Sequence, residues 1–410
     1  MELIEGAKRY QKVSYPLRYG IYSELTTRDY VFHFNLNHEI IRMWGRGQNW
    51  PHRLEWLKRT ITDTWVYYST GGYTGVFETI GEHYLPNFPY PTNNQLGGTP
   101  FAEGSVKKAI EHWYPYVNAL QNDLTAHPEG ISSFSGYKPI LPPAVLKNKG
   151  RQLRKILTGH ISVLPPDTRH VDYNVIPLIV ADGCRHKCGF CKVKNQKGYR
   201  PRSRKNIEEQ LRNLHVFFDN DLINQNALFL GEHDALGIAP EDLLWAIDQS
   251  VERLALNESY MQGTFIFLFG SVYSFLNCPD QLFDNLQDRP VTTYINIGLE
   301  SASQATLDQL QKPLKVHEVL AAFDKARFIN QNYPDIEISL NFVFDESLPK
   351  EHFVSLEQLT SERVEKVSDK GSIYLSPLRF DEPSRSRLFY FYQLKRRSRL
   401  PLFLYTIQKL

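Results

Sequence analysis

The chain has 410 residues, of which 42% are hydrophobic and 22% are charged, the composition of a soluble globular protein. Its 47 Lys and Arg residues nearly balance 45 Asp and Glu residues, which argues against a protein dedicated to nucleic acids or membrane surfaces. The length exceeds the ~250–300 residues of a single hydrophobic core and predicts more than one domain. The start carries early charges, and the most apolar window, 265–276, is shorter than the ~20 residues of a membrane span. We therefore expect a cytoplasmic protein with no signal peptide and no membrane partner.

Residues 1–170 are rich in aromatic side chains and contain five of the six tryptophans. Glycines and prolines interrupt this part repeatedly, and we interpret it as short helices, over 51–62 and 103–120, set in long ordered loops. The aromatic residues can fill a small core, which is the more ordinary role of such segments. They can also form a lid or pocket that faces a substrate. The sequence thus predicts an aromatic-rich N-terminal accessory domain, whose aromatic side chains form either a small core or a lid or pocket for the substrate.

From residue 171 to 380, apolar runs alternate with helical patterns. Continuous apolar runs of this kind are typical of buried parallel strands joined by right-handed crossovers. The runs cover residues 175–180, 227–230, 264–269, 294–299, 336–344 and 372–375. Six such units in this length suit an α/β fold with a partial (βα)6 barrel, because a closed eight-stranded barrel typically needs ~250 residues. We expect the chemistry at the carboxyl edge of the strands, and a helical tail over 381–410.

Three of the four cysteines follow the first predicted strand: Cys184, Cys188 and Cys191. Four cysteines are too few for a disulfide scaffold, so we expect these thiols to serve a specific task. Thiolates separated by three and then two residues can hold three corners of a [4Fe–4S] cluster from one loop. The fourth iron then has no protein ligand. The sequence therefore predicts a cluster with one open coordination position.

This spacing, on a loop after the first strand of a six-unit α/β region, resembles the radical SAM superfamily. The resemblance covers about residues 173–380 and is strongest to the coproporphyrinogen-oxidase-like and methylthiotransferase-like cores. It implies that the open iron binds the amino and carboxylate groups of S-adenosylmethionine (SAM). It also implies that an electron from the cluster breaks the sulfonium bond and releases a 5′-deoxyadenosyl radical. An oxygen-sensitive enzyme with an electron donor such as flavodoxin or ferredoxin is expected on this basis.

The same resemblance assigns roles to five residues outside the cysteines. Phe190, just before the third cysteine, corresponds to an apolar residue beside the adenine. Gly231 and Glu232 are similar to a glycine–acidic motif that meets the methionine ammonium group. Glu300 is similar to an acidic residue near the ribose or amino-acid part of SAM, and Ser271 is a weaker ribose candidate.

The sequence departs from the family pattern in two places. A single glycine, Gly231, precedes the acidic residue where the family has two, and the run 336–344 leads into Asp345 rather than into a glycine-rich turn. No further cysteines exist for an auxiliary cluster, which argues against the methylthiotransferase and peptide-maturase subtypes. Cys278 fits a small buried hydrophobic residue better than a radical relay or methyl carrier.

Other interpretations of the same residues remain open. His186 would complete a Cys3His zinc site, although structural zinc sites usually take their ligands from two separated hooks. The chain would then be a zinc-binding or cluster-binding structural protein without radical chemistry. A third alternative keeps the fold and uses SAM as a methyl or other group donor. The basic run over 192–205 can bind phosphate or RNA, but solvated charge is the more ordinary explanation, and the charge balance favours a small-molecule substrate.

Overall fold

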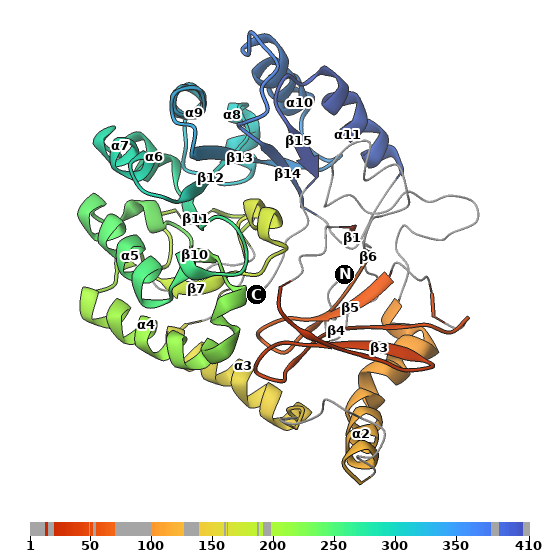
Figure 1. Ribbon diagram of the computed structural model, residues 1–410. Coiled ribbons are helices and arrows are strands. Elements are labelled where there is room, and N and C mark those ends of the chain that lie inside the picture. Colours follow the sequence, from red (N-terminus) through yellow and green to blue (C-terminus); the bar gives the residue numbers. More distant parts are fainter. Residues whose placement is uncertain are drawn as a thin grey trace. The chain divides into compact units, whose positions relative to one another are not determined.

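The protein consists of two compact units, of which the first comprises Met1–Lys155 with Phe217–Asp221 and the second Ile156–Val216 with Leu222–Leu410. The boundary after residue 155 differs from the expected boundary after residue 170, because residues 156–170 belong to the second unit. Figure 1 shows the elements of a computed structural model of the chain. The model describes residues 13–14, 20–48, 50–51, 55–69, 100–126, 139–159, 161, 163–186, 188–191, 198–378 and 385–404.

The first unit contains a six-stranded sheet in the order β1-β6-β5-β4-β3-β2, in which the β1–β6 pair is parallel and the other pairs are antiparallel. The strands are β1 (Val13–Ser14), β2 (Ser23–Thr26), β3 (Tyr30–Phe34), β4 (Ile40–Gly45), β5 (Glu55–Arg59) and β6 (Trp65–Ser69). The helices of this part of the chain are α2 (Gly104–Ala126), which follows the 3-10 turn η1 (Pro100–Ala102), and α3 (Pro143–Leu157).

The sheet corrects one expectation and α2 confirms another. The helix expected over residues 51–62 was wrong, because residues 55–59 form β5, which is buried along its whole length between β4 and β6. Pairing on both sides overrides the local helical pattern of so short a segment. The helix expected over residues 103–120 is present as α2. Aromatic rings do fill a core here, since Phe32 and Trp65 of the sheet pack in one cluster with Trp113 of α2.

The second unit is built on a seven-stranded sheet in the order β15-β14-β13-β12-β11-β10-β7, with every neighbouring pair parallel. Its strands are β7 (Ile176–Ile179), β10 (Ala227–Gly231), β11 (Phe265–Gly270), β12 (Thr292–Glu300), β13 (Ile336–Phe344), β14 (Ile373–Pro377) and β15 (Leu402–Leu404). The six strands expected from the sequence are confirmed, and the sheet is the open parallel sheet of a partial barrel. The two-residue strands β8 (Ala181–Asp182) and β9 (Arg200–Pro201) form a separate antiparallel pair.

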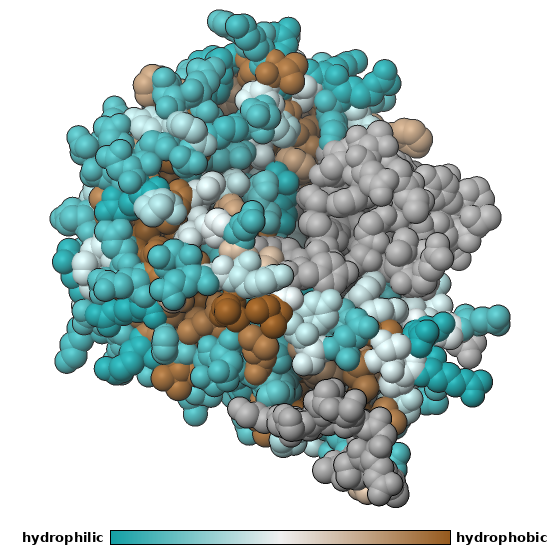
Figure 2. Space-filling model, viewed as in Figure 1, coloured by the Kyte–Doolittle hydropathy of each residue, from teal (hydrophilic) through white to brown (hydrophobic). Residues whose placement is uncertain are grey.

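Helices follow the strands of this sheet, and Figure 1 shows α4 to α9 along one side of it. The α-helices are α4 (Arg204–Phe218), α5 (Pro240–Arg253), α6 (Val272–Leu276), α7 (Gln281–Gln287), α8 (Gln304–Gln309), α9 (Val316–Asn332), α10 (Lys350–Glu357) and α11 (Arg385–Arg397). In Figure 2 hydrophilic side chains cover most of the visible surface of α4 to α7. The expected helical tail contains α11 but then returns to the sheet as β15, so it is not only helical.

The two faces of the sheet differ in polarity along β13. Side chains alternate along a strand, so that Ile338, Leu340 and Phe342 share one face while Ser339 and Asn341 share the other. Asn330 of α9 donates a hydrogen bond to the Ile338 carbonyl. The face of β13 with Ser339 and Asn341 therefore carries polar side chains within the second unit.

Among the residues that the structure describes, no helix is long and apolar enough to cross a membrane.

Candidate functional site

The residues expected at the site lie at one edge of the parallel sheet. The cysteine loop follows β7 and β8, and Gly231 ends β10. Ser271 follows β11 directly, and Glu300 is the last residue of β12. Because the carboxyl ends of parallel strands meet at the same edge, the fold brings four separate segments together there. The candidate residues therefore share the edge at which the chemistry is expected.

The cysteine loop is held in place by main-chain contacts. Cys184 forms an isolated bridge with Gly198, and its Sγ accepts a hydrogen bond from the His186 amide at 3.4 Å. Gly189 donates its N–H to the carbonyl of Leu310 at 3.0 Å, which ties the loop to the segment between α8 and α9. All four cysteines of the chain are free thiols. The loop therefore presents three reduced sulfur donors, as an iron–sulfur cluster requires.

Burial and a nearby positive charge act in opposite directions on the thiols of the loop. Burial raises the pKa of the Cys184 and Cys188 thiols, and the positive charge of Lys312 acts in the opposite direction on both. Bound iron would supply the further positive charge that stabilises the thiolates. Within the described residues, no group of three or more His, Cys, Asp or Glu side chains is placed to hold one metal ion. The ligands of a cubane bind different irons and have no need to converge on one point.

Glu232 connects the end of β10 to the start of the cysteine loop. Its Oε2 accepts a hydrogen bond from the Gly183 amide at 3.2 Å, and its own N–H donates to the Ala181 carbonyl at 3.0 Å. The peptide bond between Gly231 and Glu232 is cis. Glu232 is buried, so its carboxylate lies inside the site rather than in solvent.

Asp234 lies among the candidate residues at this edge, although its sequence context assigned it no role. Its carboxylate is fully buried and accepts hydrogen bonds from the Ser271 amide at 2.8 Å and the Ser274 hydroxyl at 2.9 Å. Arg185 of the cysteine loop approaches the same carboxylate at 3.6 Å. Asp234 thus joins the ends of β10 and β11 to the cysteine loop. The signal in the sequence is an acidic residue three positions after Gly231 and two positions after Glu232.

Ser271 is already engaged in the fold. Its hydroxyl accepts a hydrogen bond from the Ser274 amide at 3.0 Å, which caps the N-terminus of α6, and donates to the Ser274 hydroxyl at 3.0 Å. This use of the hydroxyl makes Ser271 a structural residue first, in keeping with its place as the weaker ribose candidate.

Glu300 ends β12 in a left-handed backbone conformation, with φ of 66°. Lys312 donates to its Oε1 at 3.1 Å and to the Gly298 carbonyl at 3.0 Å. Burial alone would lower the pKa of Lys312. The negative charge of Glu300 and the neighbouring thiols outweigh this effect, so the pKa is raised overall and Lys312 stays protonated. Lys312 therefore faces both Glu300 and the cysteine loop. It follows the Glu300 segment in the sequence, where no role was assigned to it.

Phe190 packs against a small apolar cluster beyond the strand ends. Its partners are Leu310, Val343 and Leu348, which lie after α8 and at the end of β13. Phe190 is partly buried there. The ring is thus placed at the same edge as the other candidates, where an apolar surface is available for an aromatic ligand group.

Two other candidate features have structural roles. Cys278 is buried between α6 and α7, and burial raises the pKa of its thiol to about 11, which suits a small hydrophobic residue. In the basic run, Arg202 donates to the Asp182 carboxylate from Nε at 3.0 Å and from Nη2 at 2.7 Å. Arg204 donates to Asp242 at 2.7 Å. Residues 192–197 of that run lie outside the described residues.

Residues 178–341 match the family model described as the radical SAM superfamily. The chain contains a radical SAM domain. Radical SAM enzymes use a [4Fe–4S] cluster and SAM, so the match associates these two cofactors with the segment that holds the cysteine loop. The match includes all three loop cysteines together with Gly231, Glu232 and Glu300.

The chain is also similar to a curated relative, the ribosomal protein uS12 methylthiotransferase RimO of Heliobacterium modesticaldum. The two are 23% identical over 211 residues, which cover 49% of this chain and 38% of the relative. The matched part thus spans well under half of that relative.

Solved structures of radical SAM enzymes resemble the chain weakly. A radical SAM methyltransferase from Sphaerobacter thermophilus is 16% identical, with a TM-score of 0.37 over 56% of this chain and 65% of that protein. Methylornithine synthase (PylB) is 11% identical, with a TM-score of 0.36 over 72% of this chain and 77% of that protein.

Proposed function

We propose that the protein cleaves SAM reductively and uses the resulting radical to abstract a hydrogen atom from a small-molecule substrate. The observation that carries this proposal is the arrangement at the sheet edge. Three free thiols on one loop lie with two buried carboxylates, Glu232 and Glu300, and a buried ammonium group, Lys312. When bound, the cluster supplies the electron that breaks the sulfonium bond of SAM.

The chain's own residues have distinct tasks in this proposal. Cys184, Cys188 and Cys191 hold the cluster. Gly231 and Glu232 orient the amino-acid end of SAM, because a buried carboxylate beside an open main-chain edge attracts an ammonium group. We assign Glu300 to the ribose or amino-acid part of SAM and Phe190 to the adenine. Ser271 is assigned to the ribose, and this is the weakest of the assignments.

Several partners follow from the same chemistry. A single-electron donor such as flavodoxin or ferredoxin has to reduce the cluster, and an exposed reduced cluster makes the enzyme oxygen-sensitive. Both points suit the cytoplasm. The first unit, within residues 1–170, is assigned the role of an accessory domain that excludes water from the radical, because a partial barrel leaves its site open.

Group transfer is the second candidate function, and it is favoured by one specific observation. The relative from Heliobacterium is named a methylthiotransferase, and its similarity covers the part of the chain that holds the cysteine loop. The chain has one cysteine, Cys278, beyond that loop, and it is buried. Transfer of a methyl group from SAM would leave S-adenosylhomocysteine, so formation of this product distinguishes group transfer from reductive cleavage alone.

The test is anaerobic reconstitution of the full chain with iron and sulfide, followed by addition of dithionite and SAM. The expected results are a brown protein, and methionine and 5′-deoxyadenosine in equal amounts. A variant in which Cys184, Cys188 and Cys191 are all replaced by alanine should lose both colour and products. The matched control, Cys278→Ala, should keep them. Bound zinc, or intact SAM under these conditions, would contradict the proposal and favour a structural metal site.

A further inference from the structure

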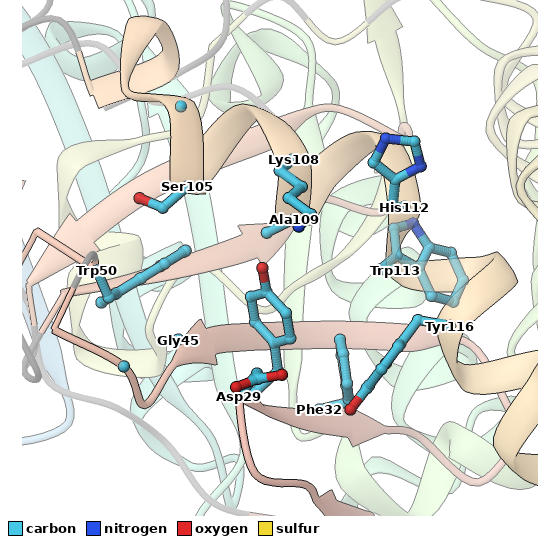
Figure 3. A pocket seen from close by; sticks show the side chains of 13 residues that line it. Asp29, Phe32, Gly45, Trp50, Ser105, Lys108, Ala109, His112, Trp113 and Tyr116 are labelled. Atoms are coloured by element: carbon cyan, nitrogen blue, oxygen red, sulfur yellow. The ribbon is translucent and has the colours of Figure 1, made fainter.

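A cavity of about 530 Å³ opens in the first unit, between the N-terminal half of α2 and the strands β3 and β4 (Figure 3). Its walls are aromatic, since Phe32, Trp50 and Trp113 line it with buried rings. Tyr116 stands beside Phe32 with the ring centroids 6.1 Å apart. The size and the apolar lining are those of small-molecule sites, which typically measure ~300–1,000 Å³.

The aromatic wall is fixed in position. The indole N–H of Trp50 donates to the Glu55 carbonyl at 2.7 Å, which sets the orientation of the ring. Gly45 makes room for that ring, because a Cβ at this position would lie 2.6 Å from it. The wall is therefore preformed, and a ligand would lose little free energy in ordering it.

Charged groups stand at the opening of this apolar cavity. Figure 3 shows Lys108 extending from α2 toward the strands, between Trp50 on one side and Tyr116 on the other. Asp29 lies on the strand side of the same cavity. Neither side chain has an ion-pair partner within the described part of the chain. An ammonium group beside aromatic rings is a site for a carboxylate attached to an apolar group, and the Asp29 carboxylate can accept an N–H.

We propose that this cavity binds a small aromatic carboxylate with the size and chemistry of an N-acylated amino acid. The ligand ring lies against Trp50 and Trp113, its carboxylate meets Lys108, and its amide N–H faces Asp29. This inference goes beyond the proposed function, because binding in the cavity requires neither the cluster nor SAM.

The test is a ¹⁹F NMR titration of the full chain, without reductant or SAM, using N-acetyl-4-fluorophenylalanine. Saturable broadening is expected, with a dissociation constant on the order of 1 mM for a ligand of this size. Lys108→Met should weaken binding of this acid about tenfold and leave binding of its neutral amide, N-acetyl-4-fluorophenylalaninamide, unchanged. The neighbouring Lys107, which is exposed and does not line the cavity, provides the control variant Lys107→Met, for which no change is expected.

A second variant locates the site independently of charge. Ser105→Trp adds a ring inside the cavity and should abolish binding of both the acid and the amide. Absence of saturable binding, or equal loss of the acid in the Lys108 and Lys107 variants, overturns the proposal. A peptide in which aspartates flank 4-fluorophenylalanine is the last arm of the titration. If the peptide binds more tightly than the free acid, the assignment to a small molecule is wrong. Because SAM cleavage is measured separately, its failure and the failure of this binding are distinguishable.

Discussion

Lys312 binds Glu300 at the end of β12, with Nζ 3.1 Å from Oε1, and both side chains are buried. The same ammonium group donates to the Gly298 carbonyl, so it closes the turn in which β12 ends. Lys312 also lowers the pKa of the thiols of Cys184 and Cys188 against the effect of burial. One lysine thus links the carboxylate assigned to SAM with the loop assigned to the cluster.

Removing Lys312 alone should destabilise the second unit strongly. Lys312→Met leaves the Glu300 carboxylate buried without its partner, and breaking a buried pair in this way costs about 3–5 kcal/mol. The double variant Glu300→Gln/Lys312→Met removes both charges and should recover most of that loss. Urea unfolding of these two variants and the wild type, under reducing conditions, measures the recovery. If the single and double variants are equally unstable, the ion pair does not hold this turn.

His352 should make stability fall in mild acid. Its ring is buried and accepts the Ser301 hydroxyl at Nδ1 while Nε2 donates to the Val343 carbonyl. Burial lowers the pKa of His352 to about 4, so the unfolded chain binds the proton first as the pH falls below about 6.5. This group alone should remove about 2 kcal/mol of stability between pH 7 and pH 5.

Asp167 acts in the opposite direction. Burial raises the pKa of its carboxyl group to about 6, and the nearby Glu337 adds to this effect. A raised pKa means that the folded chain holds the proton more tightly, so stability from this group is present at low pH and is lost as the pH rises through about 6. Between pH 7 and pH 5 it should add about 1 kcal/mol.

Substitution of these two residues separates the opposing effects. We expect Asp167→Asn to lose more stability than the wild type on going from pH 7 to pH 5, and His352→Gln to lose less. The measurement is the free energy of unfolding in urea at both pH values. Because the comparison is the difference from wild type, other titrating groups cancel. Equal pH dependence in all three proteins would show that neither group is buried in the manner described.

Deletion of the first unit should uncouple SAM cleavage from substrate. A chain that starts at Ile156 keeps the parallel sheet and the cysteine loop, so we expect it to bind the cluster. Without the accessory domain, water and buffer reach the site, and futile cleavage of SAM should rise several-fold. The measurement is 5′-deoxyadenosine formed per cluster in the absence of substrate. An unchanged rate from a soluble, cluster-loaded truncation would refute the capping role.

Much of the second unit was predictable because its signals are local. Each parallel strand is a continuous apolar run, and burial on both faces leaves that pattern whatever the neighbours are. The three cysteines belong to one loop, so their spacing carries its meaning without knowledge of the fold. The carboxyl-edge rule places Gly231, Ser271 and Glu300 on the same side of the sheet, because each follows or ends a predicted parallel strand.

The remaining features depend on residues that only folding brings together. The β5 segment became a strand because β4 and β6 pair with it, and β15 joined the sheet after a helix that had suggested a helical tail. Asp167 accepts a hydrogen bond from the Ser339 hydroxyl across 172 positions of sequence, and both residues belong to the second unit. The sequence alone determined the cofactor chemistry and the parallel strands, because short motifs and apolar runs are read locally. Tertiary structure decided the N-terminal sheet and the buried partners of the site, because pairing and burial depend on distant neighbours.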